Sequence, residues 1–425
     1  MDRFVVRGGA ALNGTVRVSG AKNSALKLVA AALLAPGRTV VRNVPAIGDM
    51  GAMAEVLRHL GVGVAEQPET QTLDVPDTLG CEAPPELVRR LRASIIVLGP
   101  ILARCGRARI PLPGGCNLGS RGIDMHLAGL AQLGAEVTYA NDYVEAVAPE
   151  GRLRGADLEL AYASVGATEN LLMAAVTARG TTRIRNAARE PEIADLASML
   201  SAMGARISGV GTPELRIEGV TALNPTEHEV VGDRIEAGTF AVAAAVTGGE
   251  VTITGADPAH VGLPLDKLRQ VGASVDASAG RITVAGGHAL RAVDVVTLPF
   301  PGFPTDMQPQ FLVLLSQAVG PSMLTENVFE ARFGFAEELA RMGADITIEG
   351  HHAIVRGPTP LRGTDVRATD LRAGAALVIA GLSAEGETAV HDARHVDRGY
   401  ADLAGKLRGL GADVRREAAA SVGAA

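Results

Sequence analysis

Six short segments of this chain follow one pattern, in which an apolar residue, a glycine and a small or β-branched residue come after an amphipathic run. The glycines recur about every 70 residues, which is typical of a repeated supersecondary unit. They are Gly61, Gly134, Gly204, Gly272, Gly343 and Gly411. A second series keeps the same interval: Gly37, Gly106, Gly180, Gly249, Gly320 and Gly386. Glycine after an apolar stripe favours a left-handed helix end, so each repeat should contain two helices.

Short strands are expected around these helices. Residues 4–8 and 12–18 alternate apolar and polar side chains and predict a two-stranded hairpin with one buried face. A helix over 25–34, a strand over 39–41 and an amphipathic helix over 53–60 follow. Each repeat therefore has a βαβαββ-type order, and the chain should fold as an α/β protein with helices packed inside sheets.

The division into domains follows from the length and from the phase of the repeat. At 425 residues the chain exceeds one ordinary core, and six repeats divide into three plus three. The last repeat ends near residue 414 without its hairpin, whereas 2–18 form a hairpin in front of the first helix. We therefore expect 1–21 to join 232–425 in one three-repeat domain and 22–231 to form the other.

The composition argues against several classes of partner. A net charge of −7 with 3% aromatic residues disfavours a nucleic-acid surface, which needs clustered cations and stacking rings. No apolar run approaches a membrane span, and no secretory signal precedes the first strand pattern. Three cysteines suit a reducing compartment and predict neither disulfides nor a zinc site. We expect a cytoplasmic protein that needs no metal or other cofactor and binds neither nucleic acid nor membrane.

Four cations lie at or near the expected starts of helices: Lys22, Arg92, Arg372 and Arg398. A cation there opposes the helix dipole at a cost of about 0.3–1 kcal/mol. One explanation is that each cation is solvated or pairs with a neighbouring acid such as Asp370 or Asp397. The other is that the helix starts and cations converge on a small, multiply charged anion, which the recurrence at matching positions favours.

A glycine-rich loop at 112–121 carries Cys116, with Arg121 five residues further on. A thiol on such a loop beside cations should have a lowered pKa and be reactive, whereas Cys81 and Cys105 read as space-filling residues. The spacing fits neither a dinucleotide fingerprint nor a Walker loop, so no nucleoside-triphosphate chemistry is expected.

Several acids and histidines could serve chemistry or structure. Asp306 precedes an apolar helix expected over 311–315, where it could act as a base or as a neighbour of the helix cap. The same two interpretations apply to Asp233, Glu190 and Glu192. His126 and His395 are either functional or ordinary hydrogen-bonded histidines.

Nine ordered motifs resemble the UDP-N-acetylglucosamine 1-carboxyvinyltransferases of the enolpyruvyl transferase superfamily. They lie at 19–23, 92–94, 112–116, 164–168, 187–192, 233–236, 303–308, 370–372 and 395–400, and the likeness extends from residue 1 to about 414. The resemblance implies two inverse α/β barrels, with helices inside and sheets outside, that hold six repeats, three per domain. It also implies transfer of the enolpyruvyl group of phosphoenolpyruvate to the 3-hydroxyl of UDP-N-acetylglucosamine by addition and elimination, with release of phosphate, the first committed step of peptidoglycan synthesis.

The resemblance further implies roles for individual residues. Asp306 would be the base for the sugar hydroxyl, and Cys116 the acid at C3 of phosphoenolpyruvate, on a loop that excludes water. Lys22 and Arg398 would be catalytic as well. Phosphoenolpyruvate would be bound by Lys22, Arg92, Arg121, Arg332, Arg372 and Arg398. The UDP-sugar would be bound by Asn23, Arg121, Gly122, Ile123, Asp124, Met125, Ser164, Val165, Gly166, Asp306 and Val328. Supporting roles would fall to Glu190, Glu192, Asp233, Asp370 and His395.

Two departures from the family pattern lie among or next to the residues expected to bind the nucleotide. Gly122 takes the place of a usual proline, and Tyr162-Ala163 precede Ser164 where the family usually has lysine or Phe-Pro. They leave open a second acceptor, such as uridine monophosphate in a specialised nucleoside pathway. A non-catalytic paralogue that only binds the nucleotide sugar is a further alternative.

Overall fold

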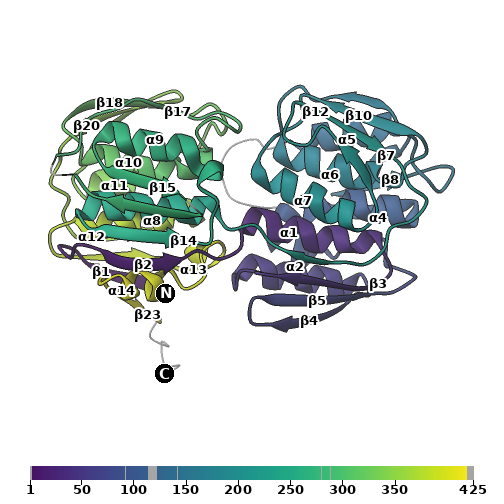
Figure 1. Cartoon of the computed structure of the whole chain (residues 1–425), viewed down its shortest axis with the longest axis horizontal. Coiled ribbons are helices and arrows are strands. Elements are labelled where there is room, and N and C mark those ends of the chain that lie inside the picture. Colours follow the sequence, from purple (N-terminus) through teal and green to yellow (C-terminus); the bar gives the residue numbers. More distant parts are fainter. Residues whose placement is uncertain are drawn as a thin grey trace. The chain divides into compact units, whose positions relative to one another are not determined.

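The computed structural model describes residues 2–90, 92–112, 122–140, 142–278, 280–287 and 289–418, apart from the side chains of 89, 90, 92–94 and 140. The chain forms two compact units. Unit 1 contains Met1–Ser19 and Gly232–Ala425, and unit 2 contains Gly20–Asn117 and Arg121–Val231. In Figure 1 the bodies of units 1 and 2 are coloured green to yellow and purple to teal, respectively, and the first strands of unit 1 are purple.

Three sheets of unit 1 each contain four strands within the described ranges. The first has the order β21 (Asp365–Arg367), β22 (Glu387–His391), β1 (Arg3–Arg7), β23 (Asp413–Glu417). The second has the order β15 (Ser274–Ser278), β16 (Arg281–Ala285), β14 (Glu250–Thr254), β2 (Asn13–Arg17). The third has the order β17 (Val295–Val296), β18 (Gly320–Thr325), β20 (His352–Gly357), β19 (Asp345–Glu349).

Among its described residues, unit 2 has two four-stranded sheets and one three-stranded sheet. Its sheets are β11 (Arg206–Ser208), β12 (Glu214–Glu218), β10 (Thr181–Arg185), β9 (Asp157–Glu159); β13 (Glu227–Glu229), β3 (Gly37–Arg42), β5 (Thr70–Val75), β4 (Gly63–Gln67); and β6 (Arg107–Pro111), β8 (Tyr143–Val147), β7 (Glu136–Ala140). Its helices are α1 (Lys22–Ala31), η1 (Ala32–Leu34), α2 (Gly48–His59), α3 (Pro85–Arg90), η2 (Arg92–Val97), α4 (Leu98–Cys105), α5 (Asp124–Gln132), α6 (Val165–Ala175) and α7 (Pro191–Ala202).

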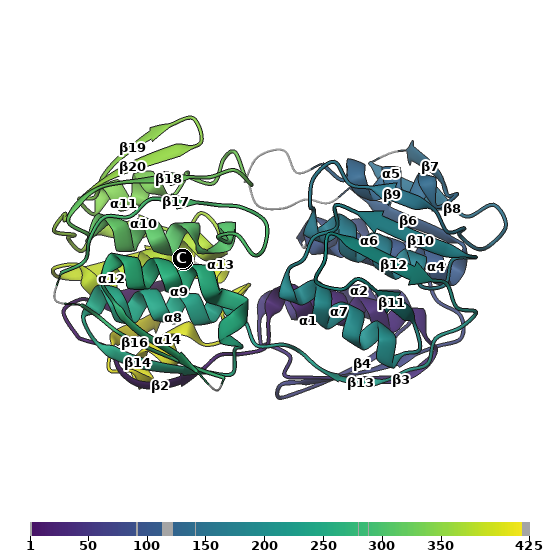
Figure 2. The same cartoon turned by 45° about the horizontal axis from the view of Figure 1, so that its top comes forward.

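The core of unit 1 is built on α8 (Arg234–Thr247), α10 (Gln308–Ser316) and α12 (Leu371–Ser383), which contact one another. Their residues are apolar and buried around nearly the whole circumference, as expected of core helices. The remaining helices are η3 (Pro258–Val261), α9 (Gly262–Val271), η4 (Thr305–Met307), α11 (Ala336–Arg341), α13 (Arg394–Asp397) and α14 (Leu403–Gly409). Figures 1 and 2 show the core helices of each unit lying between its own sheets.

The predicted hairpin over 4–8 and 12–18 is wrong, because the two strands belong to different sheets. β1 pairs antiparallel with β22 and β23, whereas β2 pairs parallel with β14. The connecting residues 8–12 form a crossover instead of a tight turn, and a Cβ on Gly8 would lie 1.9 Å from the Ala384 carbonyl oxygen. The hairpins observed lie elsewhere: β4–β5, β7–β8, β11–β12, β15–β16 and β19–β20.

The chain leaves unit 1 after β2 and returns to it after β13. β2 leads into α1 of unit 2, and β13 leads into α8 of unit 1. Within unit 2 the Ala21 amide donates to the Val231 carbonyl oxygen at 2.7 Å, and within unit 1 the Asp233 amide donates to the Ser19 carbonyl oxygen at 2.9 Å. These bonds fix the starts of α1 and α8, where Lys22 and Asp233 lie.

The first glycine series ends helices as predicted, whereas in the second series only Gly106 caps a helix, α4, and Gly37 and Gly320 begin strands β3 and β18. All six glycines of the first series have positive φ, as do five of the second. At the fourth position Gly248 (φ 68°), not Gly249, ends α8 in the left-handed conformation. Within the described ranges, no helix has the length and apolar character needed to cross a membrane.

Candidate active site

Asp306 lies at the centre of a cluster with two buried arginines in unit 1. Arg332 Nη2 donates to Asp306 Oδ1 at 2.8 Å, and Arg372 Nε and Nη2 donate to Oδ2 at 3.3 and 3.2 Å. Both arginine side chains are 2% exposed, against 25% for the aspartate. Asp306 is the cap of neither η4 nor α10, whose cap positions are Pro304 and Met307. The structure therefore brings together three predicted site residues from distant parts of the chain.

The two arginines keep hydrogen-bonding capacity after binding Asp306. Arg332 Nε and Arg372 Nη1 are buried and have no hydrogen-bond partner among the described residues. Burial alone would lower the pKa of Arg372, but its neighbours, with Tyr400 and Asp306 foremost, raise that pKa above its ordinary value. Both cations are therefore suited to an anionic ligand that supplies further oxygen acceptors.

Glu326, which the sequence did not single out, holds the segments around this cluster. Its Oε1 accepts hydrogen bonds from the Val328 amide and the Thr297 hydroxyl, each at 2.8 Å. Its Oε2 accepts from the Thr305 hydroxyl at 2.8 Å, and that hydroxyl accepts from Arg332 Nη1 at 2.9 Å. The predicted sugar-binding Val328 is thus tied to the residue preceding Asp306.

Asp370 and Asp233 cap two of the core helices. Asp370 Oδ1 accepts from the amides of Arg372 and Ala373 at 2.8 and 3.1 Å, at the start of α12. Asp233 Oδ1 accepts from the amides of Ile235 and Glu236 at 2.8 and 3.0 Å, at the start of α8. The alternative explanation that Arg372 pairs with Asp370 is wrong, because the Arg372 guanidinium binds Asp306 while Asp370 caps the helix.

Arg398 does not open a helix, contrary to the prediction. It is the C-terminal cap of α13, whose four residues end before it, and its amide donates to the His395 carbonyl oxygen at 3.4 Å. A cation at the C-terminus of a helix is compatible with the helix dipole.

Burial lowers the pKa of His395, and the charges of Arg394 and Arg398 lower it further. Asp397 binds Arg416 at 2.6 Å.

In unit 2, Lys22 opens α1 as predicted and binds an acid that the sequence did not reveal. Lys22 Nζ lies 2.7 Å from Oδ2 of Asp49, in the first turn of α2. Both side chains are less than a tenth exposed. The carboxylate offsets the cost of holding a buried ammonium group at the start of a helix.

The two predicted nucleotide-binding stretches open neighbouring helices, α5 and α6. Residues 122–125 lead into α5, and Ser164 caps α6 by accepting from the Ala167 amide at 3.3 Å. His126 Nδ1 lies 2.9 Å from Asn170 Nδ2, and a Cβ on Gly166 would lie 3.3 Å from the His126 ring. Adjacent helix starts favour an anionic group.

Asn170 connects these helices to the segment that carries Arg92. Its Oδ1 accepts from the Gly99 amide at 2.6 Å, and its Nδ2 donates to the Ile95 carbonyl oxygen at 3.2 Å. Because the amide nitrogen is a donor, His126 Nδ1 accepts and its proton lies on Nε2. Arg92 opens η2, but its side chain lies outside the described residues.

Glu190 and Glu192 are buried at the start of α7, where acids are favoured by the helix dipole. Asn23 lies in the first turn of α1 and is half-buried.

The predicted reactive Cys116 and its neighbour Arg121 lie outside the described residues. Burial raises the pKa of Cys105 to about 12, with a further contribution from Cys81, which fits a space-filling residue.

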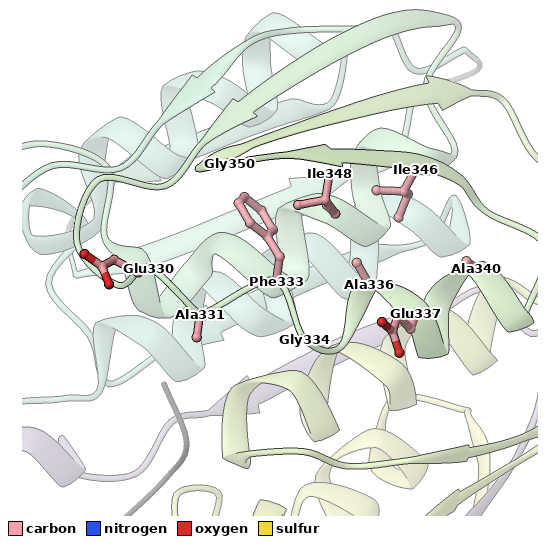
Figure 3. Close-up of a pocket in the computed structure, with 10 residues that line it drawn as sticks. All are labelled: Glu330, Ala331, Phe333, Gly334, Ala336, Glu337, Ala340, Ile346, Ile348 and Gly350. Atoms are coloured by element: carbon pink, nitrogen blue, oxygen red, sulfur yellow. The ribbon is translucent and has the colours of Figure 1, made fainter. Parts of the chain in front are cut away.

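A hollow of about 400 Å³ lies beside the segment that carries Arg332 (Figure 3). Phe333, together with Ile346 and Ile348 of β19 and residues of α11, lines it, while the carboxylates of Glu330 and Glu337 lie at its edges. None of the predicted site residues lines it. The hollow is therefore separate from the Asp306 cluster.

Comparison with known proteins gives consistent matches. Residues 6–407 match the EPSP synthase (3-phosphoshikimate 1-carboxyvinyltransferase) family. The chain is 52% identical to proteins named UDP-N-acetylglucosamine 1-carboxyvinyltransferase from Corynebacterium jeikeium and Mycobacterium tuberculosis, covering 98% of this chain and 99% of each relative.

Solved structures agree with the family match. The enolpyruvyl transferase NikO from Streptomyces tendae shares 30% identity and a TM-score of 0.89, covering 99% of both chains. An EPSP synthase from Acinetobacter baumannii, at 22% identity and a TM-score of 0.77 over 98% of this chain and 100% of its own, shares the fold. Since the family match spans nearly all of the 425 residues, the chain belongs to the EPSP synthase family of carboxyvinyltransferases.

Proposed function

We propose that this enzyme transfers the enolpyruvyl group of phosphoenolpyruvate to the 3-hydroxyl of UDP-N-acetylglucosamine and releases phosphate. This reaction would be the first committed step of peptidoglycan synthesis, and we infer that it takes place in the cytoplasm. The observation that carries the proposal is the 52% identity, over nearly the whole chain, to relatives named for this activity. Uridine monophosphate as the acceptor is not favoured.

We also propose that each unit is an inverse α/β barrel of three repeats, with domains of 22–231 and of 1–21 plus 232–425. The burial of α8, α10 and α12 on all sides supports this arrangement in unit 1. The starts of those helices carry Asp233, Asp370 and the Asp306 cluster. Helices held inside sheets would present polar residues at one end of each barrel.

In the proposed reaction Asp306 accepts the proton of the sugar 3-hydroxyl as its oxygen bonds to C2 of phosphoenolpyruvate. Cys116 supplies the proton that C3 gains. The resulting tetrahedral adduct then loses a proton from C3 while the bond from C2 to the phosphate oxygen breaks. The contacts of Arg332 and Arg372 with Asp306 support its role, since they fix the carboxylate in one orientation.

In this proposal, the cations bind the negatively charged groups of phosphoenolpyruvate. Its phosphate is bound by Lys22, Arg121 and Arg398, with Arg92, Arg332 and Arg372 nearby. The buried donors of the two arginines beside Asp306, which have no hydrogen-bond partner among the described residues, support anion binding there. A buried guanidinium donor without a partner costs free energy that a bound anion would recover.

Acceptor binding is assigned to Asn23, Val328 and the helix starts at 121–125 and 164–166. The contact of His126 with Asn170 and the closeness of Gly166 to the His126 ring support this, because they hold the first turn of α5 against α6 in unit 2. Asp124 would share this surface with the nucleotide.

The test is phosphate release from phosphoenolpyruvate, measured with UDP-N-acetylglucosamine and, separately, with uridine monophosphate. We expect release with the sugar nucleotide. Release only with the monophosphate would replace the acceptor, and binding of the sugar nucleotide without release from either would indicate a non-catalytic paralogue.

A further inference from the structure

Glu169, in the middle of α6, is a buried carboxylate. Its side chain is 0% exposed, and neither oxygen has a hydrogen-bond partner among the described residues. Its closest opposite charge is Lys27 on α1, whose Nζ lies 3.4 Å from Glu169 Oε2. A fully desolvated carboxylate with one long ion pair is costly, and such groups are common where a protein uses their charge.

The surroundings of Glu169 make its charge easy to remove. Burial raises its pKa to about 7, Lys27 opposes that rise, and Glu192 and Glu190 at the start of α7 add to it. Other titratable residues on elements packed against α6 are Arg92, Arg104, Cys105, Asp124, His126, Asp195, Glu214, Arg216 and Glu218. Of these, Asp195 binds His228, Arg216 binds Glu218 and His126 contacts Asn170.

Lys27 connects this carboxylate to the proposed substrate contacts. The same Nζ donates to the Asn23 carbonyl oxygen at 2.5 Å, in the first turn of α1. That turn carries Lys22 and Asn23, the proposed contacts for phosphoenolpyruvate and the acetamido sugar. Glu169 itself lies on the helix that opens with Ser164, at the proposed nucleotide end.

We propose that Glu169 is a positioning residue whose ionised carboxylate holds Lys27, and through it the first turn of α1, in the geometry that binds the acceptor. This inference rests on the proposed function. When Glu169 is protonated, Lys27 loses its counter-charge and the turn that carries Asn23 is held less firmly. Acceptor affinity should therefore fall as the pH drops from 8 to 6, with little change in the chemical step.

The kinetic test uses Glu169→Gln, which has the shape of the protonated acid at every pH. At pH 8 we expect its KM for UDP-N-acetylglucosamine to rise about tenfold, with kcat changed less than twofold, as expected when ground-state binding is lost. The variant should also lose the rise in KM that the wild type shows from pH 8 to pH 6. Lys27→Met should raise KM equally, and the double variant no further.

Glu236→Gln is the control, because Glu236 is also buried, in unit 1, and pairs with Lys406 at 2.6 Å. It should keep the wild-type dependence of KM on pH. The inference is overturned if Glu169→Gln keeps that dependence, if kcat falls with KM unchanged, or if the effects of Glu169→Gln and Lys27→Met simply add.

A second measurement needs no substrate and separates this inference from the proposed function. Backbone amide resonances of 23–27 should shift with pH between 6 and 8 in the wild type and stay constant in Glu169→Gln. If the wild type is inactive with UDP-N-acetylglucosamine, the proposed acceptor is wrong and this titration alone decides on Glu169. Identical titrations in both proteins would refute the coupling.

Discussion

The buried carboxylate of Glu169 should make unit 2 less stable as the pH rises. Its pKa in the folded protein is about 7, against an ordinary value of 4.5. Between these values the folded protein keeps a proton on Glu169 that the unfolded chain has released. The contribution of this group is therefore fully present below about pH 4.5 and is lost as the pH rises through 7.

The size of the effect follows from the same two values. A difference of roughly 2.5 pH units, at about 1.4 kcal/mol each, corresponds to about 3 kcal/mol of unfolding free energy between pH 4.5 and pH 8. The side chain of Glu169→Gln cannot ionise, so the unfolding free energy of this variant should fall by about 3 kcal/mol less than that of the wild type between pH 4.5 and pH 8. Comparing how the two unfolding free energies change with pH also removes any pH-independent difference between the proteins, such as the cost of burying the glutamine amide.

Hydrogen exchange of peptides from α6, followed by mass spectrometry, is the suitable assay, because the two units can unfold separately and a whole-protein signal would mix them. Opening free energies would be measured at several pH values for the wild type, for Glu169→Gln and for Glu236→Gln. Equal pH slopes for α6 in the wild type and Glu169→Gln would refute the reasoning and show that Glu169 is ionised throughout.

Three further predictions concern the proposed site. Asp306→Asn should lower kcat for phosphate release by about 10²–10⁴-fold, the usual contribution of one proton transfer, and an undiminished kcat would exclude it as the base. Fosfomycin should add one adduct to the intact mass at Cys116, which Cys116→Asp should abolish; an adduct at Cys81 or Cys105 would contradict the loop assignment. Asp233→Ala should lower the opening free energy of α8, measured by hydrogen exchange of α8 peptides, by about 1 kcal/mol through loss of the helix cap, and an unchanged value would show that the cap contributes nothing.

The first glycine series predicted helix ends correctly, because a left-handed residue without a side chain costs little there. The second series predicted them poorly, since Gly37 and Gly320 begin strands. The position of Lys22 in the first turn of α1 followed from the same spacing. These features depend on residues within one or two turns of each other.

Features that depend on distant residues were not predictable. Alternation identified the residues of β1 and β2 as strands, but it says nothing about partners at 387–391 and 250–254. Asp49, Glu326 and Glu169 have no local motif, and their importance appears only when Lys22, Thr305 and Lys27 lie beside them. Arg398 was misplaced because α13 ends after four residues, a length that periodicity does not resolve.

The most direct test of the account is the identity of the product. Nuclear magnetic resonance of a reaction containing this enzyme, phosphoenolpyruvate and UDP-N-acetylglucosamine should show vinyl protons of an enol ether on the sugar 3-oxygen, with equimolar phosphate. An enol ether at another hydroxyl, or no transfer from phosphoenolpyruvate to this nucleotide, would contradict it.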